Sequence, residues 1–172
     1  MPENIYKSAM WGNIVQLQKE LQQSTVEEIN KKEKGMKLSP LALAVQMVQV
    51  ESVKLLLAYG ADPNTENVYG QTPLFYVGEK QPVDHDTPEQ RLKIAQMLLD
   101  AGADINHCDH SNNQPLWIAV FYLKGEMDLP LVKLFLERGA NIYNKNKANR
   151  SPLDFAKQVG YSPVINLLEK YR

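Results

Sequence analysis

The sequence predicts an all-α protein, a solenoid of about five helix pairs joined by hairpin-like linkers. Two recurring motifs support this fold class. Helices begin with Pro-Leu at four places, Pro40, Pro73, Pro115 and Pro152. Helices end with Gly-Ala and then Asp or Asn at three places, which begin at Gly60, Gly102 and Gly139. One helix pair cannot bury its own apolar face, so recurring pairs indicate a stacked array.

The distance between the two motifs is constant. Each Gly-Ala motif begins 13 residues before the next Pro-Leu motif, since 73 − 60, 115 − 102 and 152 − 139 all equal 13. Successive prolines lie 33, 42 and 37 residues apart (73 − 40, 115 − 73 and 152 − 115). We therefore expect the extra residues of two repeats to lie between the helices of a pair. The larger insertion falls within residues 79–89, which are polar and interrupted by Pro82 and Pro88, so it is expected to be an exposed loop.

The helix starts share a chemical pattern. The residues before the four prolines are Ser39, Thr72, Gln114 and Ser151. A Ser or Thr hydroxyl can accept a hydrogen bond from an orphan amide of the first turn, and proline fits there because its missing N–H needs no partner. At the helix ends, glycine enters the left-handed conformation that closes a helix and that strains other residues.

These motifs resemble the ankyrin repeat, whose signature is a Thr-Pro-Leu helix start and a Leu-Leu-x-x-Gly-Ala-Asp-x-Asn ending on a period near 33 residues. The resemblance covers nearly the whole chain and implies one domain over residues 1–172. The repeats are expected at approximately 1–33, 34–66, 67–108, 109–145 and 146–172, with the first and last acting as caps.

The chain ends fit this arrangement. Residues 5–21 resemble a degenerate first repeat, with a turn at Gly12 and with Ile14, Leu17 and Leu21 at helical spacing. The linker that follows lacks Gly-Ala-Asp, and its lysine-rich run at residues 31–34 is expected to be a solvated hairpin.

Composition excludes several functions. The formal net charge is −1, from 19 Lys and Arg against 20 Asp and Glu, so general nucleic-acid binding is not expected. The single cysteine, Cys108, cannot form an intramolecular disulfide, and the first residues lack the pattern of a secretory signal, so a cytoplasmic location is expected. No apolar stretch approaches the roughly 18 residues of a membrane span, so no membrane association is expected.

Two short segments contain side chains that can ligate metals. One holds His107, Cys108 and His110, and the other is Asp84-His85-Asp86. Neither has a recognised ligand spacing, so polar turns are expected, with no metal and no cofactor. A metal-dependent regulator that uses the first set stays as an alternative. The chain has no Gly-x-x-x-x-Gly-Lys phosphate loop and no pattern typical of a catalytic site, so it is not expected to be an enzyme.

The resemblance implies a binding face, because inner helices and hairpin tips of ankyrin repeats line a concave groove. Trp117 could pack in the core or face this groove, and of the adjacent Phe121 and Tyr122 we expect Tyr122 to face it. The expected partner-binding residues are Met10, Trp11, Met36, Leu38, Met47, Tyr69, Gln71, Lys80, His110, Asn113, Trp117, Phe121, Tyr122 and Arg150.

The expected function is non-catalytic binding of another protein through this groove, as adaptor or inhibitor, by a chain that is monomeric when free. A narrower alternative is a cytoplasmic immunity protein that neutralises a cognate bacterial toxin, because small bacterial ankyrin proteins include examples of that role. A purely structural spacer is the third class, and the apolar residues expected in the groove argue against it.

Overall fold

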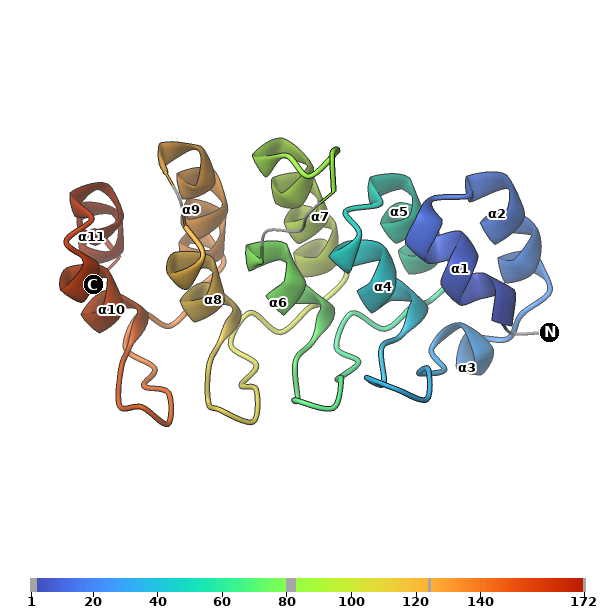
Figure 1. Cartoon of the computed structure of the whole chain (residues 1–172), viewed down its shortest axis with the longest axis horizontal. Helices are drawn as coiled ribbons and strands as arrows, with labels where there is room; N and C mark the ends of the chain where they lie inside the picture. Colours follow the sequence, from blue (N-terminus) through green and yellow to red (C-terminus); the bar gives the residue numbers. More distant parts are fainter. Residues whose placement is uncertain (1–2, 80–82, 124, 172) are drawn as a thin grey trace.

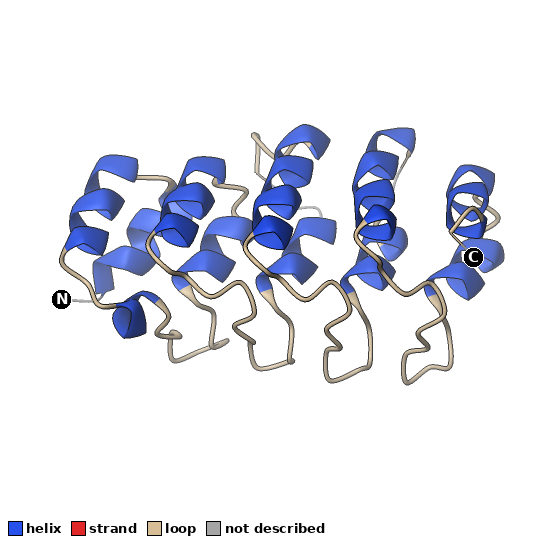
Figure 2. Ribbon diagram, turned by 180° about the vertical axis from the view of Figure 1, so that it is seen from behind, coloured by secondary structure: helices blue, strands red, loops and turns tan. Residues whose placement is uncertain are grey.

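The computed structural model describes residues 3–79, 83–123 and 125–171, and within these ranges the chain contains helices and loops but no strand (Figure 2). The predicted all-α class is therefore confirmed. The helix pairs are α1 (Glu3–Trp11) with α2 (Ile14–Gln22), α4 (Pro40–Gln46) with α5 (Val50–Ala58), α6 (Pro73–Gly78) with α7 (Pro88–Asp100), α8 (Pro115–Phe121) with α9 (Leu129–Glu137), and α10 (Pro152–Val159) with α11 (Ser162–Glu169). Two short elements, α3 (Val26–Ile29) and the 3-10 helix Glu126–Asp128, lie in connections.

The five pairs stack side by side in chain order, as an ankyrin-type solenoid requires (Figure 1). The first helices of the pairs, here called the inner helices, form one row, and the second helices, here called the outer helices, form the other. Each inner helix contacts its neighbours in the row, so that α8 lies between α6 and α10. The linkers between pairs project from one edge of the array in both views.

Helix starts follow the predicted chemistry in part. The hydroxyl of Ser39 accepts from the amide of Ala42 at 3.2 Å, and that of Ser151 accepts from the amide of Asp154 at 3.1 Å. Thr72 and Gln114 make no such bond. The Gln114 side chain donates instead to the Asn106 carbonyl oxygen at 2.7 Å, which ties the helix start to the preceding linker.

The predicted glycine caps are present at the ends of outer helices. Gly60, Gly102 and Gly139 have φ angles of +87°, +90° and +84°, which lie in the left-handed region. Asn112 and Asn149 adopt φ angles of 61° and 57° at the hairpin tips, and asparagine tolerates this conformation.

Adjacent hairpin tips are joined by single backbone hydrogen bonds. The amide of Val68 donates to Met36, that of His110 to Tyr69 and that of Lys147 to Ser111, each at 2.9 or 3.0 Å. Inside the hairpins, the side chains of Asn67, Asp109 and Asn146 each accept from two backbone amides. These polar residues hold the tips in a fixed shape.

Both insertions lie between the helices of a pair, as their spacing predicted, and a buried ion-pair network joins them. Arg91 on α7 lies 3.0 Å from Asp86 in the first insertion and 2.9 Å from Asp128, just before α9. The Asp86 side chain is only 2% exposed. The expectation of an exposed loop is therefore wrong for Asp86, because its carboxylate is paired with the buried guanidinium of Arg91.

The N-terminal linker contains the short helix α3, which the sequence did not predict. Thr25 and Glu28 form a reciprocal capping box at its start. Lys31, Lys32 and Lys34 are exposed. No helix within the described ranges is long and apolar enough to cross a membrane.

Candidate functional site

Four aromatic side chains meet where α8 and α10 lie side by side. The Trp117 ring stacks on Phe121 with centroids 4.9 Å apart and planes 17° apart, and it lies 5.6 Å from Phe155 on α10. Phe121 lies 5.2 Å from Phe155 and 5.0 Å from Tyr122. We call Trp117, Phe121, Tyr122 and Phe155 the aromatic cluster.

The periodicity of α8 explains this placement. Leu116, Ile118, Ala119 and Val120 are buried in the core. Residues four apart share one face of a helix, so Trp117 and Phe121 stack on the side that the core leaves uncovered. Phe121 is 44% exposed and Tyr122 is 40% exposed, so the stronger expectation for Tyr122 over Phe121 is not supported.

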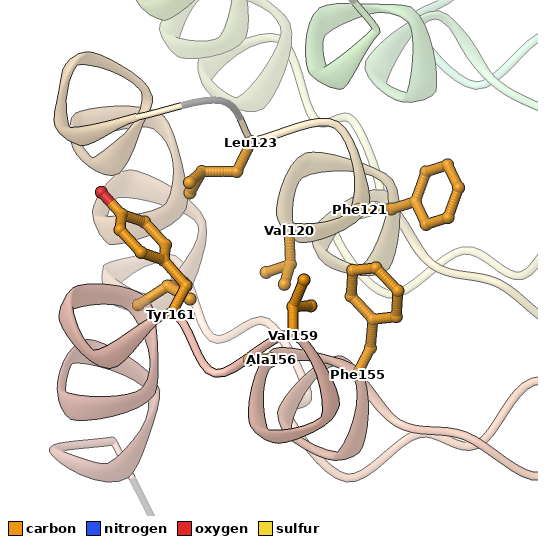
Figure 3. Close-up of a pocket in the computed structure, with 8 residues that line it drawn as sticks. Val120, Phe121, Leu123, Phe155, Ala156, Val159 and Tyr161 are labelled. Carbon is orange, nitrogen blue, oxygen red and sulfur yellow. The ribbon is translucent and has the colours of Figure 1, made fainter.

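An apolar pocket adjoins the cluster. It has a volume of about 230 Å³. Figure 3 shows Phe121 and Phe155 on one side of the two inner helices, Val120 and Val159 between them, and Leu123 and Tyr161 on the opposite side. The residues that line the pocket are Val120, Phe121, Leu123, Phe155, Ala156, Val159, Tyr161 and Val164. None of them is charged, so the pocket suits an apolar group.

Val159 is the most exposed of the residues that line this pocket. It is 62% exposed at the end of α10, although its side chain is apolar and β-branched. The expected partner-binding residues do not include Phe155, Val159 and Tyr161, although Val159 stands at the end of an inner helix, at the repeat position of Tyr122. Phe155 could have been found, because it follows its own Pro-Leu motif and stands 38 residues after Trp117, one more than the 37 residues between Pro115 and Pro152.

The predicted partner-binding residues do not form one continuous group in the structure. Trp117, Phe121 and Tyr122 come together in the aromatic cluster. Met36, Tyr69 and His110 are exposed at successive hairpin tips, Trp11 is exposed at the end of α1, and Met10, Met47, Gln71, Asn113 and Arg150 are partly exposed. Lys80 lies outside the described residues.

The expectation that Leu38 lies on the binding surface is wrong. Leu38 is only 8% exposed and belongs to the hydrophobic core. The amide of Leu38 donates to the Glu33 carboxylate at 3.1 Å, and its carbonyl oxygen accepts from the Glu33 amide at 2.9 Å. These bonds join the two ends of the turn within the linker, and burial of the leucine side chain in the core is favourable.

The side chains of Gln71 and Asn113 form hydrogen bonds within and between the hairpins. Gln71 accepts from the Asn67 side chain at 3.0 Å. Asn113 donates to Asp109 at 3.1 Å and accepts from Asn146 of the next hairpin at 3.0 Å. Their polar atoms are therefore partly committed to the hairpins themselves.

Trp11 lies in a different place from the aromatic cluster. It is 66% exposed and lines an open depression of about 530 Å³ with Gln49, His85 and Gln90. The His85 ring nitrogen Nε2 lies 2.8 Å from the Met47 carbonyl oxygen, so the first insertion reaches back over the α4–α5 turn. Trp11 and Tyr122 occupy equivalent repeat positions, but α4 and α6 stand between their helices.

His107 and Cys108, two of the side chains considered for metal binding, have other partners. His107 Nε2 lies 2.9 Å from the Gly70 carbonyl oxygen and 3.5 Å from a Glu66 carboxylate oxygen. Cys108 Sγ lies 3.7 Å from the Asn106 carbonyl oxygen. Within the described part of the chain, no three His, Cys, Asp or Glu residues form a group that could hold a metal ion. The metal-dependent alternative thus has no ligand cluster there.

Burial shifts the pKa of two side chains in the helix pair before α8. Glu79 follows α6 directly and is partly buried. This burial raises the pKa of the Glu79 carboxyl above its ordinary value, since a charged group is poorly solvated there. Burial also raises the pKa of Tyr76, whose hydroxyl accepts a hydrogen bond from Asn67 at 2.7 Å.

Known proteins similar to this chain contain ankyrin repeats. The family model described as ankyrin repeats, in three copies, matches residues 6–107. An ankyrin repeat protein of fowlpox virus is 32% identical over 141 residues, which cover 68% of this chain and 73% of that protein. An ankyrin repeat protein of Acanthamoeba polyphaga mimivirus is 28% identical over 121 residues, covering 69% of this chain and 68% of that protein.

Longer relatives share only a segment. Inversin of Canis lupus familiaris is 32% identical over 118 residues, which cover 69% of this chain but 10% of inversin. A second fowlpox virus ankyrin repeat protein is 31% identical over 130 residues, which cover 19% of its length. The aromatic cluster lies beyond residue 107, where the family-model match ends.

Proposed function

Because the chain belongs to the ankyrin repeat family, whose repeats generally mediate protein–protein interaction, we propose that it is a non-catalytic module that binds another protein at the aromatic cluster. One observation carries this proposal. Phe121, Tyr122 and Val159 are exposed, Phe121 and Val159 line an apolar pocket, and the Tyr122 ring packs against Phe121. Binding energy at protein interfaces concentrates in aromatic residues that fill such pockets.

The surroundings of the cluster favour binding with little reorganisation. Trp117 and Phe155 pack against Phe121, and α8 is held between α6 and α10. A side chain that is already packed loses less rotational freedom when a partner covers it. The cluster therefore supports recognition as a preformed surface.

The partner is proposed to extend along the inner helices toward the hairpin tips. Met36, Tyr69 and His110 are exposed there and are joined through the backbone bonds between tips. Contact with these residues, and with Trp11, stays a prediction. The cytoplasmic location, the monomeric free state and the absence of general nucleic-acid binding also stay predictions.

Two roles fit such a module. As an adaptor, the chain leaves the activity of its partner intact and brings it to a third molecule. As an inhibitor, of which a toxin-neutralising immunity protein is one form, it suppresses that activity. An activity assay of the purified partner, with and without one equivalent of the chain, separates the two roles.

The proposal is tested by affinity capture from the native cell with three baits, followed by mass spectrometry. The baits are the unchanged chain, a Phe121→Ala/Tyr122→Ala variant, and a control with Val15→Ala/Val26→Ala, which removes apolar side chains exposed away from α8 and α10. We expect one partner to be captured by the first and third baits and lost with the second. Hot-spot truncation of two residues predicts a loss of affinity on the order of 100-fold.

Equal capture of that partner by all three baits, with all three folded by circular dichroism, would exclude the aromatic cluster as the binding site. The depression around Trp11 and the first insertion would then be the next surface to test.

A further inference from the structure

The charge of the chain is unevenly distributed around the aromatic cluster. Residues 141–161 contain four basic residues, Lys145, Lys147, Arg150 and Lys157, and one acidic residue, Asp154, so that their net charge is 4 − 1 = +3. The whole chain has a net charge of −1, so the other residues together carry −1 − 3 = −4. The last hairpin and α10 are thus a basic segment in an otherwise acidic protein.

One of these cations bonds to α10, the helix that supplies Phe155, Ala156 and Val159 to the pocket lining. Arg150 Nη1 donates to the Gln158 side chain at 3.2 Å, which brings the guanidinium along α10 to the residue next to Val159. Lys147 and Lys145 are exposed in the hairpin, and Lys157 lies 2.9 Å from Glu169.

The acidic member of the segment already has a structural role. The Asp154 carboxylate accepts from the Ser151 amide at 3.0 Å as part of a capping box. This bond and the Ser151 hydroxyl, with smaller contributions from Lys145 and Lys157, hold the pKa of Asp154 below its ordinary value. Asp154 thus offsets one charge of a segment that remains basic.

We infer that the part of the partner that occupies this site is an acidic peptide segment with one large apolar side chain, which enters the pocket between α8 and α10. The inference rests on the proposed function and specifies its partner. The uncharged lining of the pocket selects the apolar side chain, and the basic segment, which contains Val159, selects the acidic residues around it.

The distribution of charge also indicates on which side of α8 the acidic residues of the partner lie. Glu79 follows α6, which contacts one side of α8, whereas the basic segment contains α10, which contacts the other side. The acidic residues of the partner therefore lie over α10 and the hairpin that precedes it. Exposed charges are screened over about 8 Å at physiological ionic strength, so affinity falls as salt rises.

The experiment uses a phage-displayed library of random dodecapeptides, selected on the full-length chain. Recovered peptides are synthesised with a fluorescent label, and Kd is measured by anisotropy against four proteins: the unchanged chain, Val159→Gln, Lys147→Glu/Arg150→Glu, and Lys19→Glu/Lys54→Glu. The last variant makes the same change in net charge on the outer helices α2 and α5.

We expect peptides with net negative charge around one large apolar residue. Their Kd should rise at least about tenfold with Val159→Gln and with Lys147→Glu/Arg150→Glu, and less than about twofold with Lys19→Glu/Lys54→Glu. Val159 is exposed and glutamine favours helices, so Val159→Gln should stay folded, and its thermal unfolding curve verifies this.

Two results overturn the inference in distinguishable ways. Peptides that depend on Val159 but carry no net negative charge, or whose Kd responds equally to both charge reversals, would refute the acidic partner and leave the proposed site standing. Peptides that bind unchanged to folded Val159→Gln, or a selection that enriches none, would refute the site and the acidic partner together.

Discussion

The side-chain amide of Asn106 is bonded to Gly139 of the next repeat: its Nδ2 donates to the glycine carbonyl oxygen at 3.0 Å. Its Oδ1 accepts from the Asn141 amide at 2.9 Å. Asn64 makes the same pair of bonds to Gly102 and Asp104, and Asn30 makes it to Gly60 and Asp62. Each asparagine thus fastens the end of the following outer helix, which keeps successive repeats in register.

Replacement of Asn64 by Ala removes two inter-repeat bonds, so we expect the free energy of unfolding to fall by about 1–2 kcal/mol. The melting temperature should fall by about 2–6 °C, as measured by circular dichroism. The control is Asn166→Ala, which makes the same exchange at an exposed position of α11. A drop no larger than that of the control would show that the asparagine bonds do not stabilise the stack.

Replacement of Gly102 by Val should destabilise through backbone strain. The φ angle of Gly102 is +90°, but a Cβ added there would meet nothing within 4 Å, so no clash contributes. The expected loss is about 1 kcal/mol or more, since a β-branched residue fits the left-handed region poorly. Gly125→Val is the control, because Gly125 has an extended φ of 173° and equally open surroundings. Urea unfolding should separate the two variants, and equal midpoints would contradict the cap assignment.

Removal of Arg91 should cause a large loss of stability. Arg91→Ala leaves the Asp86 carboxylate buried without its cation, and breaking a buried pair in this way costs about 3 kcal/mol. Lys93→Ala is the matched control: Lys93 lies 3.9 Å from Glu51, and both side chains are about 60% exposed, so its loss should cost less than about 1 kcal/mol. Similar urea midpoints for the two variants would show that Arg91 does not join the insertions.

Two carboxyl groups should affect stability in opposite directions as pH changes. Burial raises the folded-state pKa of Glu79 above 4.5, so its contribution is fully present below that value and is lost as pH rises through the folded pKa. Glu79→Gln should therefore raise the melting temperature at pH 7, and the gain should shrink toward pH 4.

For Asp154 the sign is reversed. Hydrogen bonds from Ser151 lower its folded-state pKa below 3.8, so its contribution is present above that value and is lost as pH falls through the folded pKa. Asp154→Asn should lower the melting temperature at pH 7 by more than it does at pH 3. A pH-independent effect of either variant, measured by differential scanning fluorimetry, would contradict the corresponding assignment.

The repeat architecture could be predicted because its determinants are local. Proline opens a helix and glycine closes one through their own backbone preferences, so Pro115 and Gly102 mark helix ends without knowledge of the fold. The constant spacing between them placed both insertions between helices, where the structure has them.

The features that sequence reasoning missed depend on residues that meet only after the repeats stack. Arg91 and Asp128 stand far apart in the chain and become partners when α7 and α9 lie side by side. Phe155 joins Trp117 across the α8–α10 contact. Leu38 is a hairpin residue by its position in the repeat, and its side chain is buried only because the stacked repeats form a core beside it.

The binding of another protein at the aromatic cluster is tested most directly by amide hydrogen exchange of the chain, free and saturated with the captured partner. We expect the largest added protection in α8, in α10 and in the hairpin of residues 141–150, with little change in α2 and α5. Protection confined to α2 and α5, or to the α1–α2 turn at Trp11, would contradict binding at the aromatic cluster.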